Sequence, residues 1–203
     1  MMKFVRAFSL CVAAGVPLAA GAATESGLFA ARGLGANSCA ALTSEAGATL
    51  DPDLRGQLAS WIAGYVSYAN RNDSGAFETM PVQNPNALAE LTRLICGHNP
   101  DILIESAFHA VLERFAPLAQ ADETALETLS TAQYQVPVRA GVLADVQQYL
   151  VAQNYLAADA ADGRYGPKTA AALTAYQKAH NLTQTGLPDA MTLFLISGAL
   201  KAE

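Results

Sequence analysis

A chain of 203 residues with 18 acidic and 12 basic side chains is acidic overall, and this balance excludes nucleic acid as a favoured partner. The length allows one domain or two small ones. Beyond the N-terminal leader, no stretch is apolar for long enough to cross a bilayer, so we expect no membrane-spanning helix.

Residues 1–23 have the pattern of a secretory signal peptide. Two basic residues, Lys3 and Arg6, precede an apolar run, and small residues follow at the spacing of a cleavage site. Without this leader, ten basic side chains face 18 acidic ones. The whole acidic excess lies in residues 24–137, whereas residues 138–203 are neutral. The sequence therefore predicts an exported, periplasmic protein with two domains of different character.

Cleavage of the leader also removes Cys11, so the exported chain keeps two cysteines, Cys39 and Cys96. Two cysteines in an exported protein favour a single disulfide. A loop of ~60 residues closed in this way stabilises a fold by roughly 4 kcal/mol on the loop-entropy model. A metal site is the alternative, but two cysteines without clustered histidines make a poor one.

Three stretches of residues 24–116 show apolar side chains at helical spacing. The first helix is predicted over residues 53–71 and the second over residues 84–96. The third is predicted to begin at Asn99, as an N-cap before Pro100, and to end at residue 115. This half of the chain is predicted to be entirely helical.

Residues 117–137 are rich in Thr and acidic side chains and show weaker periodicity, which favours a linker with a short helix near residues 123–129. Three further helices are predicted after it, the second opened by Pro167 and the third by Pro188. The predicted fold class is all-α, with small helical domains at residues 24–116 and 138–203 joined by the linker at residues 117–137.

The stretch DGRYGPKT, from Asp162 to Thr169, follows a QQYL helix and precedes ALTAYQ and a Thr-Gly turn. Over residues 138–200 this pattern resembles the three-helix peptidoglycan-binding repeat found beside many cell-wall hydrolases. The resemblance implies a helical module that binds peptidoglycan and has no chemistry of its own. Such a module would raise the concentration of its partner domain at the wall.

The candidate ligand-binding residues of this module are Asn154, Asp162, Arg164, Tyr165 and Tyr176. Arg164 could pair with a carboxylate of a stem peptide. A purely structural interpretation stays open for the same motif. In that interpretation Tyr165 packs under the turn, Asp162 caps it, and Gln147 and Gln177 satisfy loop carbonyls.

The segments SCAAL, WIAGYVSYAN and LTRLICGHNPDILIESAF, which contain Cys39 and Cys96, are similar to the HdeA/HdeB family of periplasmic acid-stress proteins. This resemblance implies a helical domain with one disulfide that holds unfolding client proteins at acid pH. Two alternatives remain open. One is an immunity or inhibitor protein against a cell-wall-degrading enzyme, and the other is an envelope assembly or scaffold factor.

No catalytic set is evident in the sequence. His98 and His109 lie eleven residues apart and lack a third credible metal ligand. Glu105 and Glu113 lie eight apart, as solvated helical carboxylates often do. The sequence thus predicts a non-enzymatic protein without metal or cofactor. Its C-terminal domain would bind peptidoglycan, and its N-terminal domain would bind a periplasmic protein or unfolded clients.

Overall fold

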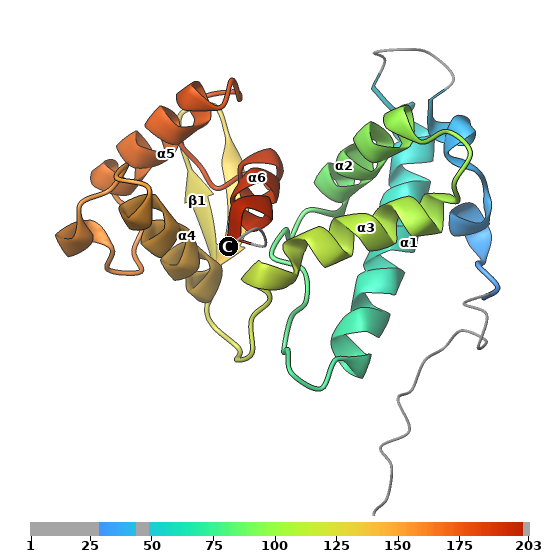
Figure 1. Cartoon of the computed structure of the whole chain (residues 1–203), viewed down its shortest axis with the longest axis horizontal. Helices are drawn as coiled ribbons and strands as arrows, with labels where there is room; N and C mark the ends of the chain where they lie inside the picture. Colours follow the sequence, from blue (N-terminus) through green and yellow to red (C-terminus); the bar gives the residue numbers. More distant parts are fainter. Residues whose placement is uncertain (1–28, 44–48, 201–203) are drawn as a thin grey trace, which may run out of the picture. The chain divides into compact units, whose positions relative to one another are not determined.

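The computed structural model describes residues 29–43 and 49–200, and the predicted signal peptide lies outside the described residues. The first half of this part is helical (Figure 1). Its helices are α1 (Pro52–Asn72), α2 (Pro85–His98) and α3 (Ile104–Phe115), and two 3-10 turns, Gly33–Ala36 and Cys39–Leu42, precede them. The second half contains β1 (Leu126–Ser130), β2 (Gln135–Arg139), α4 (Ala140–Ala152), α5 (Pro167–Ala179) and α6 (Ala190–Leu200).

The first two helices begin within one residue of their predicted starts, and each has an N-cap side chain followed by a proline. Asp51 accepts hydrogen bonds from the first backbone N–H groups of α1, and Pro52 occupies the first helical position. Asn84 and Pro85 play the same parts at the start of α2. Both helices are therefore set by local sequence, and α2 contacts α1 and α3.

The third helix starts later than the sequence predicts. Asn99 ends α2 rather than capping α3, because its side-chain amide donates to the Ile95 carbonyl. The following backbone pairs with the 3-10 turns instead. The carbonyls of Pro100 and Ile102 accept hydrogen bonds from residues 39–40, and α3 begins only at Ile104. A long-range backbone pairing thus overrides the local start signal.

The predicted disulfide between Cys39 and Cys96 is confirmed, and it joins the second 3-10 turn to the end of α2. Both cysteines are fully buried. Nearby, Trp61 of α1 lies against Phe108 and donates its indole N–H to the Arg32 carbonyl at 2.9 Å. The backbone of Gly35 passes so close to the Trp61 ring that a Cβ there would lie 2.2 Å from an indole carbon.

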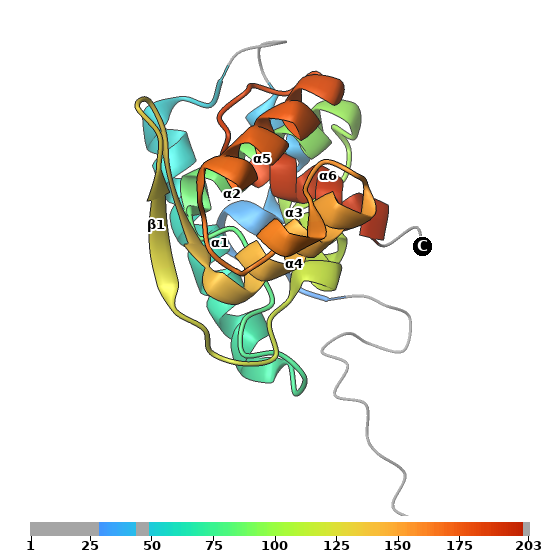
Figure 2. The ribbon, with the colours of Figure 1, turned by 90° about the vertical axis from the view of Figure 1, so that its left-hand side faces the viewer.

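The segment expected to hold a short helix near residues 123–129 forms a strand instead, so the all-α prediction is wrong in this part of a mostly helical chain. The strands β1 and β2 pair antiparallel, with Leu129 opposite Val136. Alternation explains the outcome, because Leu129 and Val138 are buried on one face while their neighbours stay accessible. Figure 2 shows β1 as the outer strand, with β2 between it and the helices.

The last helix, α6, contacts elements from both halves of the described chain: α2 and α3 as well as α4. Phe194 packs edge-on against Phe115 of α3, and the Ser197 hydroxyl donates to the Arg114 carbonyl at 2.7 Å. Residues 31–203 group as one compact unit. The division into two domains is therefore not confirmed, and its boundaries stay a prediction.

Candidate functional site

The turn before α5 is shaped by local chemistry. Asp162 accepts a hydrogen bond from the Arg164 backbone N–H at 2.9 Å, and Gly163 has φ +75°, which side chains disfavour. Pro167 then occupies the first position of α5, as predicted. The DGRYGP sequence thus specifies a fixed turn that leads directly into a helix.

A buried glutamine holds this turn in place. Gln147 of α4 has no exposed surface, and its side-chain amide accepts from the Gly163 N–H at 2.7 Å. The same amide donates to the Arg164 carbonyl and to the Thr169 hydroxyl, both at 2.9 Å. The structural role suggested for Gln147 is therefore confirmed.

A second buried glutamine, Gln177 of α5, holds the turn before α6 in the same way. Its amide accepts from the Gly186 N–H and donates to the Leu187 carbonyl and the Thr192 hydroxyl, each at 2.9 Å. The Tyr165 hydroxyl donates to the Gly186 carbonyl at 2.8 Å and so ties the two turns together. Burial raises the pKa of Tyr165, which keeps this donor protonated.

Beside the first turn lies a hollow of about 330 Å³. Its lining side chains come from the turn, from the start of α5 and from the 3-10 turn Ala158–Ala160, and include Asp159, Asp162, Arg164 and Lys168. Gly166 supplies no capping side chain, so the first N–H groups of α5 have no side-chain cap, and this positive end of the helix borders the hollow. Two cationic side chains beside a helix N-terminus suit a carboxylate.

The hollow also carries its own acidic groups. The Lys168 ammonium lies 3.5 Å from Asp159, but both side chains are more than two-thirds exposed, so this ion pair contributes little. Arg164 forms no ion pair within the described residues. Its guanidinium is exposed and open to an anionic partner.

The structure brings together only two of the five candidate residues, Asp162 and Arg164. Tyr165 is half-buried between the turns, and Asn154 lies two residues after the end of α4 in the left-handed conformation, with φ +61°. Tyr176 is 1% exposed in the core, where its ring meets Tyr149 and Tyr155 edge-on. Sequence reasoning missed Lys168, although it stands inside the quoted GPKT segment.

Of the acidic and histidine side chains considered for catalysis, Glu105 and His109 of α3 contact Tyr65 of α1. The Tyr65 hydroxyl donates to Glu105 at 2.9 Å and lies 3.3 Å from His109 Nδ1. Burial, and then the Glu105 carboxylate, raise the pKa of Tyr65 well above its ordinary value. Across the described residues no three His, Cys, Asp or Glu side chains are placed to share a metal ion.

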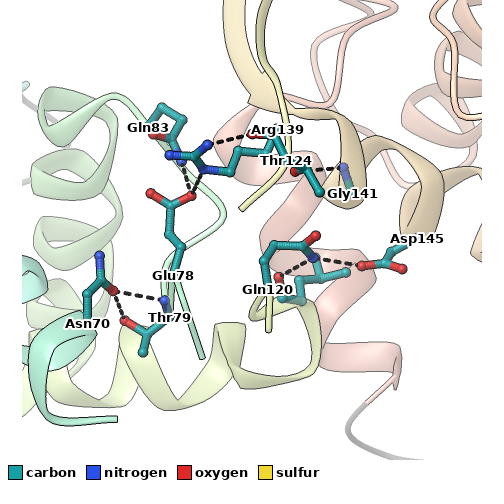
Figure 3. Close-up of polar contacts among 10 residues, drawn as sticks. Asn70, Glu78, Thr79, Gln83, Gln120, Thr124, Arg139, Gly141 and Asp145 are labelled. Atoms are coloured by element: carbon teal, nitrogen blue, oxygen red, sulfur yellow. Dashed lines mark hydrogen bonds and ion pairs between the residues drawn. The ribbon is translucent and has the colours of Figure 1, made fainter. Parts of the chain in front are cut away.

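A polar junction joins the first half of the described chain to the hairpin (Figure 3). Glu78 pairs with Arg139 and also accepts from the Gln83 amide at 2.9 Å. Arg139 donates further to the Thr124 carbonyl, and the backbones of Glu78 and Gln120 form a bridge. The junction fixes how the hairpin meets the segment that leads into α2.

The C-terminal part thus contains three helices, two turns held by buried glutamines and a hollow lined by charged side chains. Residues 141–195 match the family model of the peptidoglycan binding domain. Comparison with curated proteins gave no match, and comparison with solved structures gave none. The comparisons give no support to the resemblance of residues 24–116 to HdeA/HdeB.

A peptidoglycan-binding domain together with a disulfide points to an envelope or extracellular location. Within residues 29–43 and 49–200, no helix combines the length and the apolar character needed to cross a bilayer.

Proposed function

We propose that this protein binds peptidoglycan without modifying it, and that the hollow beside the turn at residues 162–168 holds an acidic group of the wall. The family match over residues 141–195 carries the proposal. The geometry supports it, because Arg164, Lys168 and the start of α5 border one hollow. Stem peptides end in carboxylates, which are the groups that such a site prefers.

The test is co-sedimentation of the full chain with purified sacculi across a salt series. Because the chain is acidic, charge alone gives it no reason to adhere to an anionic wall. We expect retention that persists at an ionic strength of about 0.15 M, where exposed charges more than ~8 Å apart are screened. Retention that disappears with modest salt, or recovery in the supernatant throughout, would count against wall binding.

Paired variants locate the contact. Replacing Arg164 and Lys168 by alanine should reduce retention, since both cations border the hollow. Lys178→Ala is the matched control, because it removes a positive charge from an exposed position in the last turn of the same helix. Equal effects of Lys168→Ala and Lys178→Ala would argue against the hollow as the site.

For the first three helices we propose a protein-binding role, either for a periplasmic partner or for unfolded clients. The acidic excess of residues 24–137 supports a basic partner. Pull-down from an envelope extract at neutral and acid pH separates the hypotheses. A single partner at neutral pH fits an immunity, inhibitor or scaffold protein, whereas protection of an aggregating client only at acid pH fits a chaperone.

A further inference from the structure

A groove of about 220 Å³ runs between three segments that are far apart in the sequence. They are the start of α2 with the residues before it, the end of the hairpin turn with β2, and the start of α6. Val82, Ala87, Pro137, Pro188 and Leu193 give its walls an apolar character. The groove therefore combines the first half of the described chain with the peptidoglycan-binding repeat.

One border of the groove is the edge of β2 rather than one of its faces. Tyr134 of the hairpin turn and three consecutive residues of β2, 135–137, line it, although side chains alternate between the two faces of a strand. The edge of a strand presents consecutive residues to the same space, whereas one face does not. The groove thus meets the backbone of β2 on the side away from β1.

The hairpin register shows which backbone groups this edge offers. Thr131 donates to the Tyr134 carbonyl, and Ala140 donates to the Ala125 carbonyl, so hydrogen-bonded pairs alternate from these positions. Gln135 and Pro137 fall at the other positions, where backbone groups point away from β1. Within the described chain, no protein group binds the Gln135 N–H or C=O.

We propose that the edge of β2 binds an extended segment of a wall peptide, which adds to the hairpin as a short third strand. A matching ligand must present the N–H and C=O of one residue on the same side, as an extended peptide does. The single acetamido group of an amino sugar points its N–H and C=O in opposite directions and cannot satisfy both groups of Gln135. The small apolar walls fit the methyl side chains of alanine residues.

Pro137 limits the addition to a short ligand. It has no N–H, so it offers only a carbonyl to the incoming strand, and a long partner strand would leave its own carbonyl unpaired there. The site therefore favours a peptide of a few residues over an extended protein strand. This inference rests on the proposed function, since it takes the peptidoglycan peptide as the ligand.

The probe is the synthetic peptide L-Ala-γ-D-Glu-L-Lys-D-Ala, titrated into the full chain and followed by amide NMR. We expect the Gln135 amide to shift and to gain protection from exchange. In a series of depsipeptides, which replace each amide N–H in turn by an ester oxygen, one member should bind about tenfold more weakly, because it loses the hydrogen bond to the Gln135 carbonyl. Equal binding by the whole series would overturn the proposal.

A groove variant and its control complete the test. Ala87→Leu places a larger side chain in the groove and should weaken peptide binding about tenfold, whereas Ala63→Leu, on an exposed part of α1, should not. The choice of ligand would be overturned if a chitin tetrasaccharide shifted the amide NMR signal of Gln135 and the peptide did not. If the full chain binds sacculi and Ala87→Leu binds equally well, only the groove is wrong. If the full chain never sediments with sacculi, the proposed function fails first and this inference with it.

Discussion

Glu78 and Arg139 lie 61 residues apart and form an ion pair whose side chains are only 12% and 15% exposed. The pair connects the segment before α2 to the last residue of β2. Arg139 also lies over the Phe77 ring, with 5.0 Å between the guanidinium carbon and the ring centre. The position of the hairpin against α2 therefore depends on a partly buried arginine, whose charge is neutralised by Glu78.

Glu78→Ala should lower the free energy of unfolding by about 1–3 kcal/mol, because it leaves the partly buried Arg139 guanidinium without the carboxylate that it binds. Asp159→Ala breaks an exposed pair with Lys168 and should cost less than about 1 kcal/mol. Urea unfolding of both variants measures the difference. Similar costs for the two variants would contradict a buried junction.

The disulfide should stabilise the first three helices most directly. Replacing Cys39 and Cys96 by serine should cost roughly 4 kcal/mol, on the loop-entropy estimate for a closed loop of this length. Hydrogen exchange should show greater opening of α1, α2 and α3 than of α4 and α5. Uniform loss of protection across all helices would argue against separate domains.

Gly35→Ala should destabilise the protein by about 1–3 kcal/mol, because the new methyl group collides with the Trp61 ring. Gly56→Ala is the opposite case. Gly56 lies inside α1 with nothing within 4 Å of an added Cβ, so alanine should stabilise the helix by about 0.5–1 kcal/mol. Thermal melts of both variants report the sign of each change.

Gln147→Met keeps the volume of the side chain but removes three hydrogen bonds that hold the turn at residues 162–168. Each polar group left buried without a partner should cost about 1–3 kcal/mol. Retention on sacculi should fall as well, because the hollow loses its shape. Gln153→Met, at an exposed position after α4, is the control and should leave both measurements unchanged.

Alkaline pH should destabilise the protein, because the hydroxyl groups of buried tyrosines ionise more readily in the unfolded state than in the folded state. The pKa values of Tyr65, Tyr165 and Tyr176 are raised, chiefly by burial, whereas tyrosine in the unfolded state has a pKa of about 10. Above that pH the unfolded state releases protons that the folded state keeps, so the free energy of unfolding decreases as pH rises. Below it these groups contribute no pH dependence. Urea unfolding midpoints measured from pH ~8 to ~11 should decline only above about pH 10. The decline should be less steep in Tyr176→Phe, which has one buried tyrosine fewer.

Local sequence was sufficient to predict the starts of α1, α2 and α5, because an Asx cap or a proline acts within a few residues. It failed at Asn99, where the backbone pairs with the distant turn at residues 39–40. It failed again at the hairpin, because each short strand buries only one side chain, Leu129 or Val138, and this alternation is too weak to indicate a strand.

The candidate site also combines features set by neighbouring residues with features set by distant contacts. Asp162 and Arg164 share a hollow because they share a turn, and the motif that contains them was visible in the sequence. The burial of Tyr176 depends on Tyr149 and Tyr155 from another helix and a loop. The groove beside β2 depends on three separate segments. Neither the burial of Tyr176 nor the groove could be predicted from the spacing of residues in the sequence.

The position of α6 has a consequence for how this protein can evolve. Its last turns meet α3, where the backbone of Gly198 leaves room for the Arg114 guanidinium and Ser197 binds the Arg114 carbonyl. A recombination event that joined residues 138–203 to an unrelated protein would leave Phe194 and Ile196 without part of their covering. The repeat in this chain is thus poorly suited to exchange between genes, because part of the surface of α6 is covered by α2 and α3.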